Sequence, residues 1–181
     1  MSNNDRPLTE CYVAYLDLMG VRKLAEKAAE DSALCESIIS ALKETKNTSS
    51  FVHETRDIET GETSKSSLQV QAFSDCVVLF IPTETKMLPW LLASVRRLHD
   101  RLLRLTVPVR GGITVGAMHW DTAWDKENGS EAKESAPVAF GPGLVAAYDL
   151  EDDTAVYPRI LISSALYDHV DERTKLKNKV F

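Results

Sequence analysis

The sequence contains no apolar run long enough for a transmembrane helix, which needs about 20 consecutive apolar residues. Its polar N-terminus, from Ser2 to Arg6, also lacks the apolar stretch of a signal peptide. We therefore predict a cytoplasmic protein that does not insert into a membrane.

Cysteine and basic charge are also scarce. Cys11, Cys35 and Cys76 are an odd number with no Cys-x-x-Cys spacing, which argues against structural zinc and disulfides and predicts reduced, buried thiols. The formal net charge of -6 predicts no nucleic acid partner, because such proteins usually present a basic face to phosphates. A small anionic ligand bound through a cation remains open.

The length of 181 residues and the 44% hydrophobic content predict a single domain over residues 1–181, with a core at about 11–170. The hydrophobic patterns predict, in order, a strand at 11–17, a helix at 21–46, strands at 49–58, 67–73 and 76–81, a helix at 85–105, a strand at 107–118, a helix at 144–151, and a strand at 155–163 that leads into a short helix. This order predicts an α+β fold, a ferredoxin-like βαββαβ core with helices on one face of the sheet. An extra hairpin around 59–66 and a mobile loop around 119–137 complete the prediction.

Two aspartates lie at the edges of apolar runs in similar surroundings, Asp17 in Tyr12-Val-Ala-Tyr-Leu-Asp-Leu-Met-Gly20 and Asp75 in Val70-Gln-Ala-Phe-Ser-Asp-Cys-Val-Val-Leu-Phe80. An unpaired buried charge costs several kcal/mol, and Mg²⁺ or Mn²⁺ offsets that cost. The pattern therefore predicts a metal site. Taken alone, Asp17 also fits a helix N-cap and Asp75 a turn residue.

Four segments carry a family resemblance: Tyr15-Leu-Asp-Leu-Met-Gly20, Phe73-Ser-Asp75, Val109-Arg-Gly-Gly-Ile-Thr-Val-Gly116 and Phe140-Gly-Pro-Gly-Leu-Val-Ala-Ala-Tyr-Asp-Leu-Glu151. In order and spacing they resemble the catalytic domain of class III nucleotidyl cyclases. With Tyr157-Pro-Arg-Ile160, they look in particular like the pyrimidine cyclases of the bacterial Pycsar anti-phage system. The resemblance covers roughly residues 12–163 and implies a ferredoxin-like core of the class III cyclase type.

The resemblance implies that Asp17, Asp75 and the backbone carbonyl of Leu18 hold two divalent cations, Mn²⁺ or Mg²⁺. Cyclisation joins the ribose 3′ hydroxyl to the α-phosphorus, so one cation can acidify the nucleophile while the other neutralises the triphosphate. The turn that follows Leu18 opens a helix and would offer backbone N–H groups to phosphate oxygens. The nucleotide-binding residues predicted there are Met19, Gly20, Val21 and Arg22.

The adenine-recognising Lys and Asp of adenylate cyclases correspond to Gln71 and Val138 in this chain. Adenine selection is therefore disfavoured. Gln71 could hydrogen-bond to uracil or cytosine after rotation of its amide, so both UTP and CTP remain candidate substrates. Alternatively, Gln71 is an ordinary strand residue. Phe51 could stack on the base, or belong to the core.

The helix after Gly141 departs from the family pattern, because Val145 and Asp149 stand where many class III enzymes carry Asn and Arg. Asp149 would repel the negative charge that develops at phosphorus. Another cation is then needed for catalysis, and Arg159 is the first candidate and Arg110 the second. Tyr148 could donate one hydrogen bond. A supporting role for Arg110 in the fold or dimer, and a surface salt bridge for either Arg, remain open.

Gly111 and Gly112 are predicted to let two backbones approach closely. The four histidines show no ligand spacing, and we predict no catalytic role for them.

The resemblance predicts a homodimeric uridylate cyclase with active sites at the subunit interface, which converts UTP to 3′,5′-cyclic UMP and pyrophosphate. The product would be a second messenger of antiviral defence that activates a separate effector. One alternative is cyclisation of CTP to cyclic CMP. Another, from a different class, is a regulatory nucleotide-binding module that kept the metal aspartates and lost catalysis.

Overall fold

A computed structural model describes residues 8–48, 52–56, 63–73, 75–85, 87–120 and 139–178. In chain order it contains β1 (Thr9–Leu18), α1 (Val21–Glu30), α2 (Ser32–Thr48), β2 (Val52–Arg56), β3 (Thr63–Ser67), β4 (Gln69–Phe73), β5 (Cys76–Pro82), the 3₁₀ turn η2 (Thr83–Thr85), α3 (Leu88–Arg104), β6 (Val109–Trp120), β7 (Ala139–Phe140), α4 (Pro142–Thr154), β8 (Ile160–Ile162) and α5 (Ser164–Asn178). No helix in these ranges has both the length and the apolar character needed to cross a membrane.

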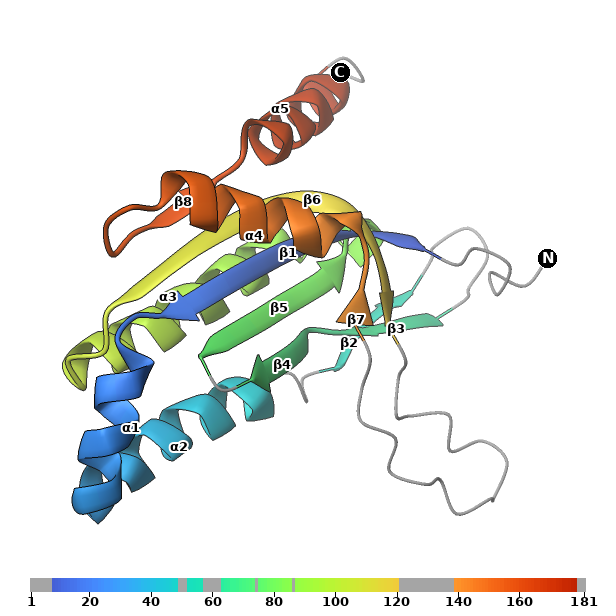
Figure 1. The fold of residues 1–181 in the computed structure, drawn as a ribbon. Helices are drawn as coiled ribbons and strands as arrows, with labels where there is room; N and C mark the ends of the chain where they lie inside the picture. The colour runs from blue at the N-terminus through green and yellow to red at the C-terminus, as the bar shows by residue number, and fades with distance from the viewer. Residues whose placement is uncertain are drawn as a thin grey trace.

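The main sheet has six strands in the order β4-β5-β1-β6-β7, and β8 pairs with β6 (Figure 1). All pairs are antiparallel except β6 with β8, so the sheet is mixed. Strands β1 and β4 run in the same direction on either side of β5, and the segment that connects them contains α1, α2, β2 and β3. In the same way, α3 connects β5 to β6 across β1. Strands β2 and β3 form a separate antiparallel pair.

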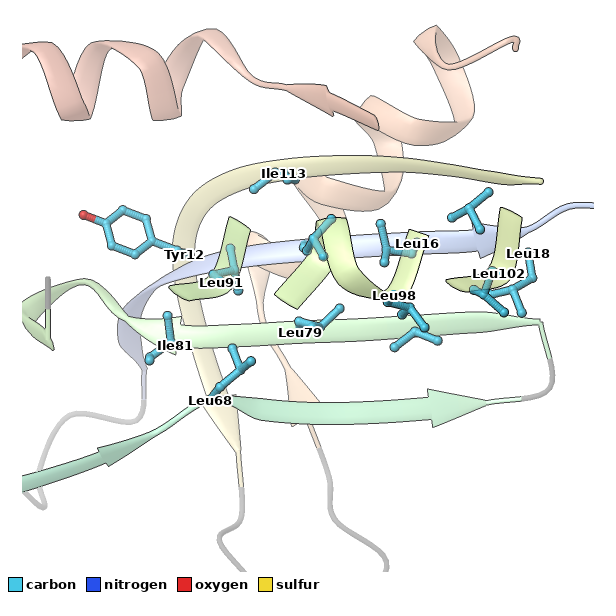
Figure 2. Packing of buried hydrophobic residues seen from close by; sticks show 14 of the residues in the cluster. Tyr12, Leu16, Leu18, Leu68, Leu79, Ile81, Leu91, Leu98, Leu102 and Ile113 are labelled. Atoms are coloured by element: carbon cyan, nitrogen blue, oxygen red, sulfur yellow. The ribbon is translucent and has the colours of Figure 1, made fainter. Parts of the chain in front are cut away.

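The larger core lies between the sheet and the helices α1, α2 and α3. Alternate residues of β1 point into it, among them Leu16 and Leu18, which are nearly inaccessible. Helix α3 contributes apolar side chains that recur at helical spacing along one face. Figure 2 shows two of them, Leu91 and Leu98, packed over β1 and β5. This packing fixes the position of the central strands.

A smaller core lies on the other face of the sheet, under α4 (Figure 1). It includes Cys11, Val13 and Met118 from the strands and Ala147 from α4, all fully buried. Helix α4 can lie this close because β6 has glycine beneath it. A Cβ on Gly112 would overlap the carbonyl oxygen of Ala147, and a Cβ on Gly111 would meet the backbone of β1. The predicted close backbone approach at these glycines is confirmed.

The α+β class is confirmed, and several element boundaries are corrected. The helix expected at 21–46 is two helices, because Asp31 ends α1 and its Oδ1 accepts hydrogen bonds from the Ala33 and Leu34 amides at the start of α2, both at 3.0 Å. Helices cover both faces of the sheet, because β1 and β6 carry apolar side chains on both faces.

The predicted strand at 155–163 narrows to the three residues of β8. A bend at Tyr157 and Pro158 precedes it, and Pro158 has no backbone N–H to donate to a sheet. The short helix expected after it has fifteen residues, and β7 was not predicted. The expected loop at 119–137 begins two residues late, because β6 extends to Trp120. The rest of that loop lies outside the described residues, as do residues 59–62 of the expected hairpin tip, whereas residues 63–66 belong to β3.

Candidate metal centre

The two aspartates meet at one end of the sheet. Asp17 is the last residue but one of β1, and its register partner on β5 is Cys76, the residue directly after Asp75. The amide of Leu18 donates a 2.7 Å hydrogen bond to the carbonyl oxygen of Asp75. Because neighbouring strands lie about 5 Å apart, these contacts place both aspartates and the carbonyl of Leu18 in one neighbourhood.

The turn after Leu18 leads into α1 as predicted. Gly20 has a φ of 75°, a conformation that favours glycine, and it forms the N-cap of the helix. The amide of Met19 already donates to the carbonyl oxygen of Pro108 at 2.9 Å. The N–H groups that point out of the helix start are therefore those from Val21 and Arg22 onward, which have no intrahelical acceptor at any helix N-terminus.

Arg110 is the register partner of Asp17 on the other side, in β6. Its Nη2 and Nε donate to Oδ2 of Asp17 at 2.9 and 3.3 Å. The hydrogen bond to Asp17 is the main cause of a raised pKa for the Arg110 guanidinium. Both side chains are about three-quarters buried, with exposed fractions of 23% for Asp17 and 25% for Arg110. This pair is therefore less screened by solvent than an ordinary surface salt bridge.

Glu151 completes this cluster and was missed as a functional candidate. It lies on α4 with its side chain 3% exposed, and its Oε1 is 2.9 Å from Nη2 of Arg110. That contact lacks hydrogen-bond geometry, so Oε1 is buried without a hydrogen-bond partner among the described residues. Burial raises the pKa of Glu151, and Arg110 opposes the shift. The available signal was helical spacing, because Gly143, Ala147 and Glu151 form the buried stripe of α4.

Tyr148 lies one turn before Glu151 on α4, beside the cluster. Its ring packs edge to face against Tyr15 with centroids 5.4 Å apart, and Tyr15 is two residues before Asp17 on the same face of β1. Burial, followed by the neighbouring Cys76, raises the pKa of Tyr15 well above its ordinary value. Tyr148 itself is 44% exposed, so part of its side chain is accessible to solvent.

Arg159 lies elsewhere in the chain. Its Nη2 donates to the carbonyl oxygen of Thr154 at 2.6 Å, and its own carbonyl accepts from the Gly111 amide at 3.0 Å. It lines an open hollow of about 400 Å³ beside α3, with Arg96 and Ile113 among the other lining residues. Ile113 faces the α3 core, whereas Asp17 faces α4. The structure therefore does not bring Arg159 to Asp17 within one chain.

Gln71 is on the edge strand β4, in the register row that continues through Val78 to Tyr15. The next row on the same face runs from Phe73 through Cys76 to Asp17, and Phe73 is 59% exposed. Paired residues of adjacent strands share a face. Gln71 and Phe73 therefore lie on the same face of the sheet as Asp17. The sequence analysis did not single out Phe73 for the base.

The remaining positions divide into exposed residues and residues that are not described. Val145 and Asp149 are exposed on α4, one turn apart and away from its buried stripe. Phe51 and Val138, and the side chain of Arg22, lie outside the described part of the chain.

No protein-family model matches this chain, and no curated protein gives a significant match.

The donors around Asp17 suit a hard divalent cation. Two carboxylates and one backbone carbonyl are the oxygen ligands that Mg²⁺ and Mn²⁺ prefer, and such ions commonly complete their coordination with water and substrate phosphates. No group of three or more His, Cys, Asp or Glu side chains arranged around a common metal position occurs within the described ranges. In this structure the guanidinium of Arg110 supplies the positive charge next to Asp17. The oxygen atoms of Asp17, Asp75 and the Leu18 carbonyl are therefore chemically suited to supply part of the coordination of a divalent cation.

Proposed function

We propose that this chain is a pyrimidine nucleotide cyclase that converts UTP to 3′,5′-cyclic UMP and pyrophosphate. The observation that carries the proposal is the convergence of Asp17 and Asp75 at one sheet end, beside the start of α1. The strand order β4-β5-β1-β6, with its two helical crossovers, supports it, because a ferredoxin-like core has this order. The motif order that resembles class III cyclases supports it independently of the fold.

In the proposed reaction, Asp17, Asp75 and the Leu18 carbonyl hold the divalent cations. Bound there, two such ions would make the ribose 3′ hydroxyl more acidic and neutralise the triphosphate. The helix start at Val21 orients phosphate oxygens through its N–H groups and the positive end of the α1 dipole. The hydroxyl of Tyr148 lies on the same side of the sheet and can donate a hydrogen bond to the nucleotide.

The base is proposed to lie over the edge of the sheet formed by β4. Gln71 would present its amide to the Watson–Crick edge, and the exposed ring of Phe73 gives an apolar surface next to it. An amide can satisfy either uracil or cytosine after rotation. Cyclisation of CTP is therefore the nearest alternative.

A homodimer is part of the proposal. Exposed apolar side chains occur on α4, in the β8 region and on α5, and subunit interfaces are enriched in such side chains. They include Val145, Tyr148, Val156, Tyr157, Ile162 and Tyr167. Because Arg159 lies beside α3, a role for it at the reacting phosphate requires a second copy of the chain. The cyclic nucleotide would then act as a second messenger on a separate effector in antiviral defence.

One observation favours a second candidate function, a regulatory nucleotide-binding module. Within one chain no cation other than Arg110 is described beside Asp17, and Val145 and Asp149 are exposed where a transition-state donor is expected. Such a module would bind the nucleotide and its cations without turnover.

The deciding experiment incubates the purified chain with each of the four NTPs and Mn²⁺ and identifies products by mass spectrometry. Cyclic UMP is expected, and Asp17→Ala and Asp75→Ala should each abolish it while keeping the native circular dichroism spectrum. Cyclic CMP alone would select the alternative substrate, and binding without product would select the regulatory module. A cyclic purine, or full turnover by either variant, would overturn the assignment.

A further inference from the structure

The side chain of Arg110 bridges two carboxylates from different elements. One nitrogen, Nη2, is 2.9 Å from Oδ2 of Asp17 on β1 and 2.9 Å from Oε1 of Glu151 on α4. We propose that Glu151 is a positioning residue that holds Arg110 as a built-in counter-ion, so that Asp17 exchanges the guanidinium for a divalent cation. This inference rests on the proposed cation site at Asp17.

The burial of Glu151 keeps Arg110 in the cluster. The side chain of Glu151 is only 3% exposed, and a buried carboxylate without a positive partner costs several kcal/mol. Arg110 is the cation in contact with it among the described residues. Removing the guanidinium from Glu151 is therefore more costly than removing it from Asp17, which is 23% exposed.

A cation bound to Asp17 would change the partner of Arg110. A divalent ion on Oδ2 of Asp17 repels the guanidinium and replaces it as the positive partner of that carboxylate. Oε1 of Glu151 can then accept the guanidinium, because it lies at ion-pair distance from Arg110 and makes no hydrogen bond with a described residue. Forming that charge-assisted hydrogen bond offsets the bond lost at Asp17. Glu151 thereby sets how strongly Arg110 competes with the cation.

Comparison of Glu151 with Asp152 separates the positioning of Arg110 from the effect of negative charge alone. Asp152 follows Glu151 on α4, is exposed, and acts on Arg110 and Glu151 through space without a direct contact. Replacing either acid with its amide removes one negative charge from the same helix. Only Glu151→Gln removes a carboxylate that contacts Arg110.

The test measures Mn²⁺ affinity by isothermal titration calorimetry on the full chain, without nucleotide. In Glu151→Gln, Arg110 keeps only Asp17 as a contacting carboxylate, so the dissociation constant for Mn²⁺ should rise by about tenfold, the effect of one charge-assisted hydrogen bond. The matched control Asp152→Asn should stay within about twofold of the wild type, because exposed charges are screened.

The double variant Arg110→Met with Glu151→Gln keeps the net charge of the wild type and removes both charges of the Arg110–Glu151 pair, which leaves Asp17 without its guanidinium partner. It should bind Mn²⁺ at least as tightly as the wild type, because the competing guanidinium is gone. Equal affinities for Glu151→Gln and Asp152→Asn, or a double variant as weak as Glu151→Gln, would overturn this inference and leave the proposed function standing. A wild-type chain that binds no Mn²⁺ in either the absence or presence of UTP would remove the proposed function as well.

Discussion

A carboxylate at the end of a buried strand needs a positive partner, and Asp17 has two possible ones. In the structure the partner is Arg110, whose contact with Oδ2 is a charge-assisted hydrogen bond at 2.9 Å. A divalent cation would satisfy the same oxygen and also reach Asp75 and the Leu18 carbonyl. In the proposed exchange between these partners, Glu151 would regulate metal affinity through its contact with Arg110.

Cys11 gives a residue-scale prediction about pH. It is fully buried, and burial, with the nearby charge of Glu10, raises its pKa from 9.0 to about 12. The unfolded thiol therefore ionises first, and between about pH 9 and pH 12 the unfolded state binds fewer protons than the native state. The free energy of unfolding should fall as pH rises through that window, by up to about 1.4 kcal/mol per pH unit from this thiol.

Urea unfolding of the wild type and Cys11→Ala at pH 8, 9 and 10 measures this slope. The variant should lose less stability per pH unit, although its absolute stability is lower because a buried sulfur is removed. Cys35→Ala, on α2, keeps Cys11 and should retain the wild-type slope. Identical slopes in Cys11→Ala and the wild type would show that the thiol is not the titrating group.

At the scale of elements, the site depends on the close packing of α4 on β6. Glycines at the contact bring Ala147 against the strand, and Glu151 follows one turn later over Arg110. Tyr148, which lies between Ala147 and Glu151 in the sequence, packs on Tyr15. The distance between this helix and the sheet therefore determines whether Glu151 reaches Arg110.

Gly112→Ala tests that dependence. The new Cβ would overlap the Ala147 carbonyl oxygen and crowd the Cβ of Leu150 at 3.0 Å, so α4 must move away from the sheet. Overpacking of this kind costs about 1–3 kcal/mol, which thermal unfolding should show as a lowered Tm. Mn²⁺ affinity should change as well, because Glu151 moves with α4.

The control for this substitution is Gly20→Ala, where nothing lies within 4 Å of the new Cβ but φ is 75°. It should lose about 1 kcal/mol through backbone strain alone and leave the packing of α4 unchanged. A Gly112→Ala protein as stable as the wild type would mean that α4 does not depend on this contact.

Across the whole molecule, the α+β class and the order of most elements followed from hydrophobic periodicity, because α3 and the central strands carry long regular patterns. The break at Asp31 and the two-residue strand β7 were not predicted, because a single capping aspartate and a two-residue strand change the hydrophobic pattern very little. The aspartates could be found because a charge at the edge of an apolar run is conspicuous.

The contacts that connect the site could not be found in the same way. Arg110 and Glu151 are 41 positions apart in the sequence, and only the docking of α4 on β6 brings them together. The position of Arg159 beside α3 likewise depends on how the turn before β8 returns to the sheet. Sequence spacing carries no information on either contact.

The most direct test of the central claim is a crystal structure grown with Mn²⁺ and a non-hydrolysable UTP analogue, with diffraction data collected at the manganese absorption edge. We predict anomalous difference density in contact with the carboxylates of both Asp17 and Asp75, and Arg110 displaced toward Glu151. Manganese bound away from these two side chains, with Arg110 still on Asp17, would contradict the account.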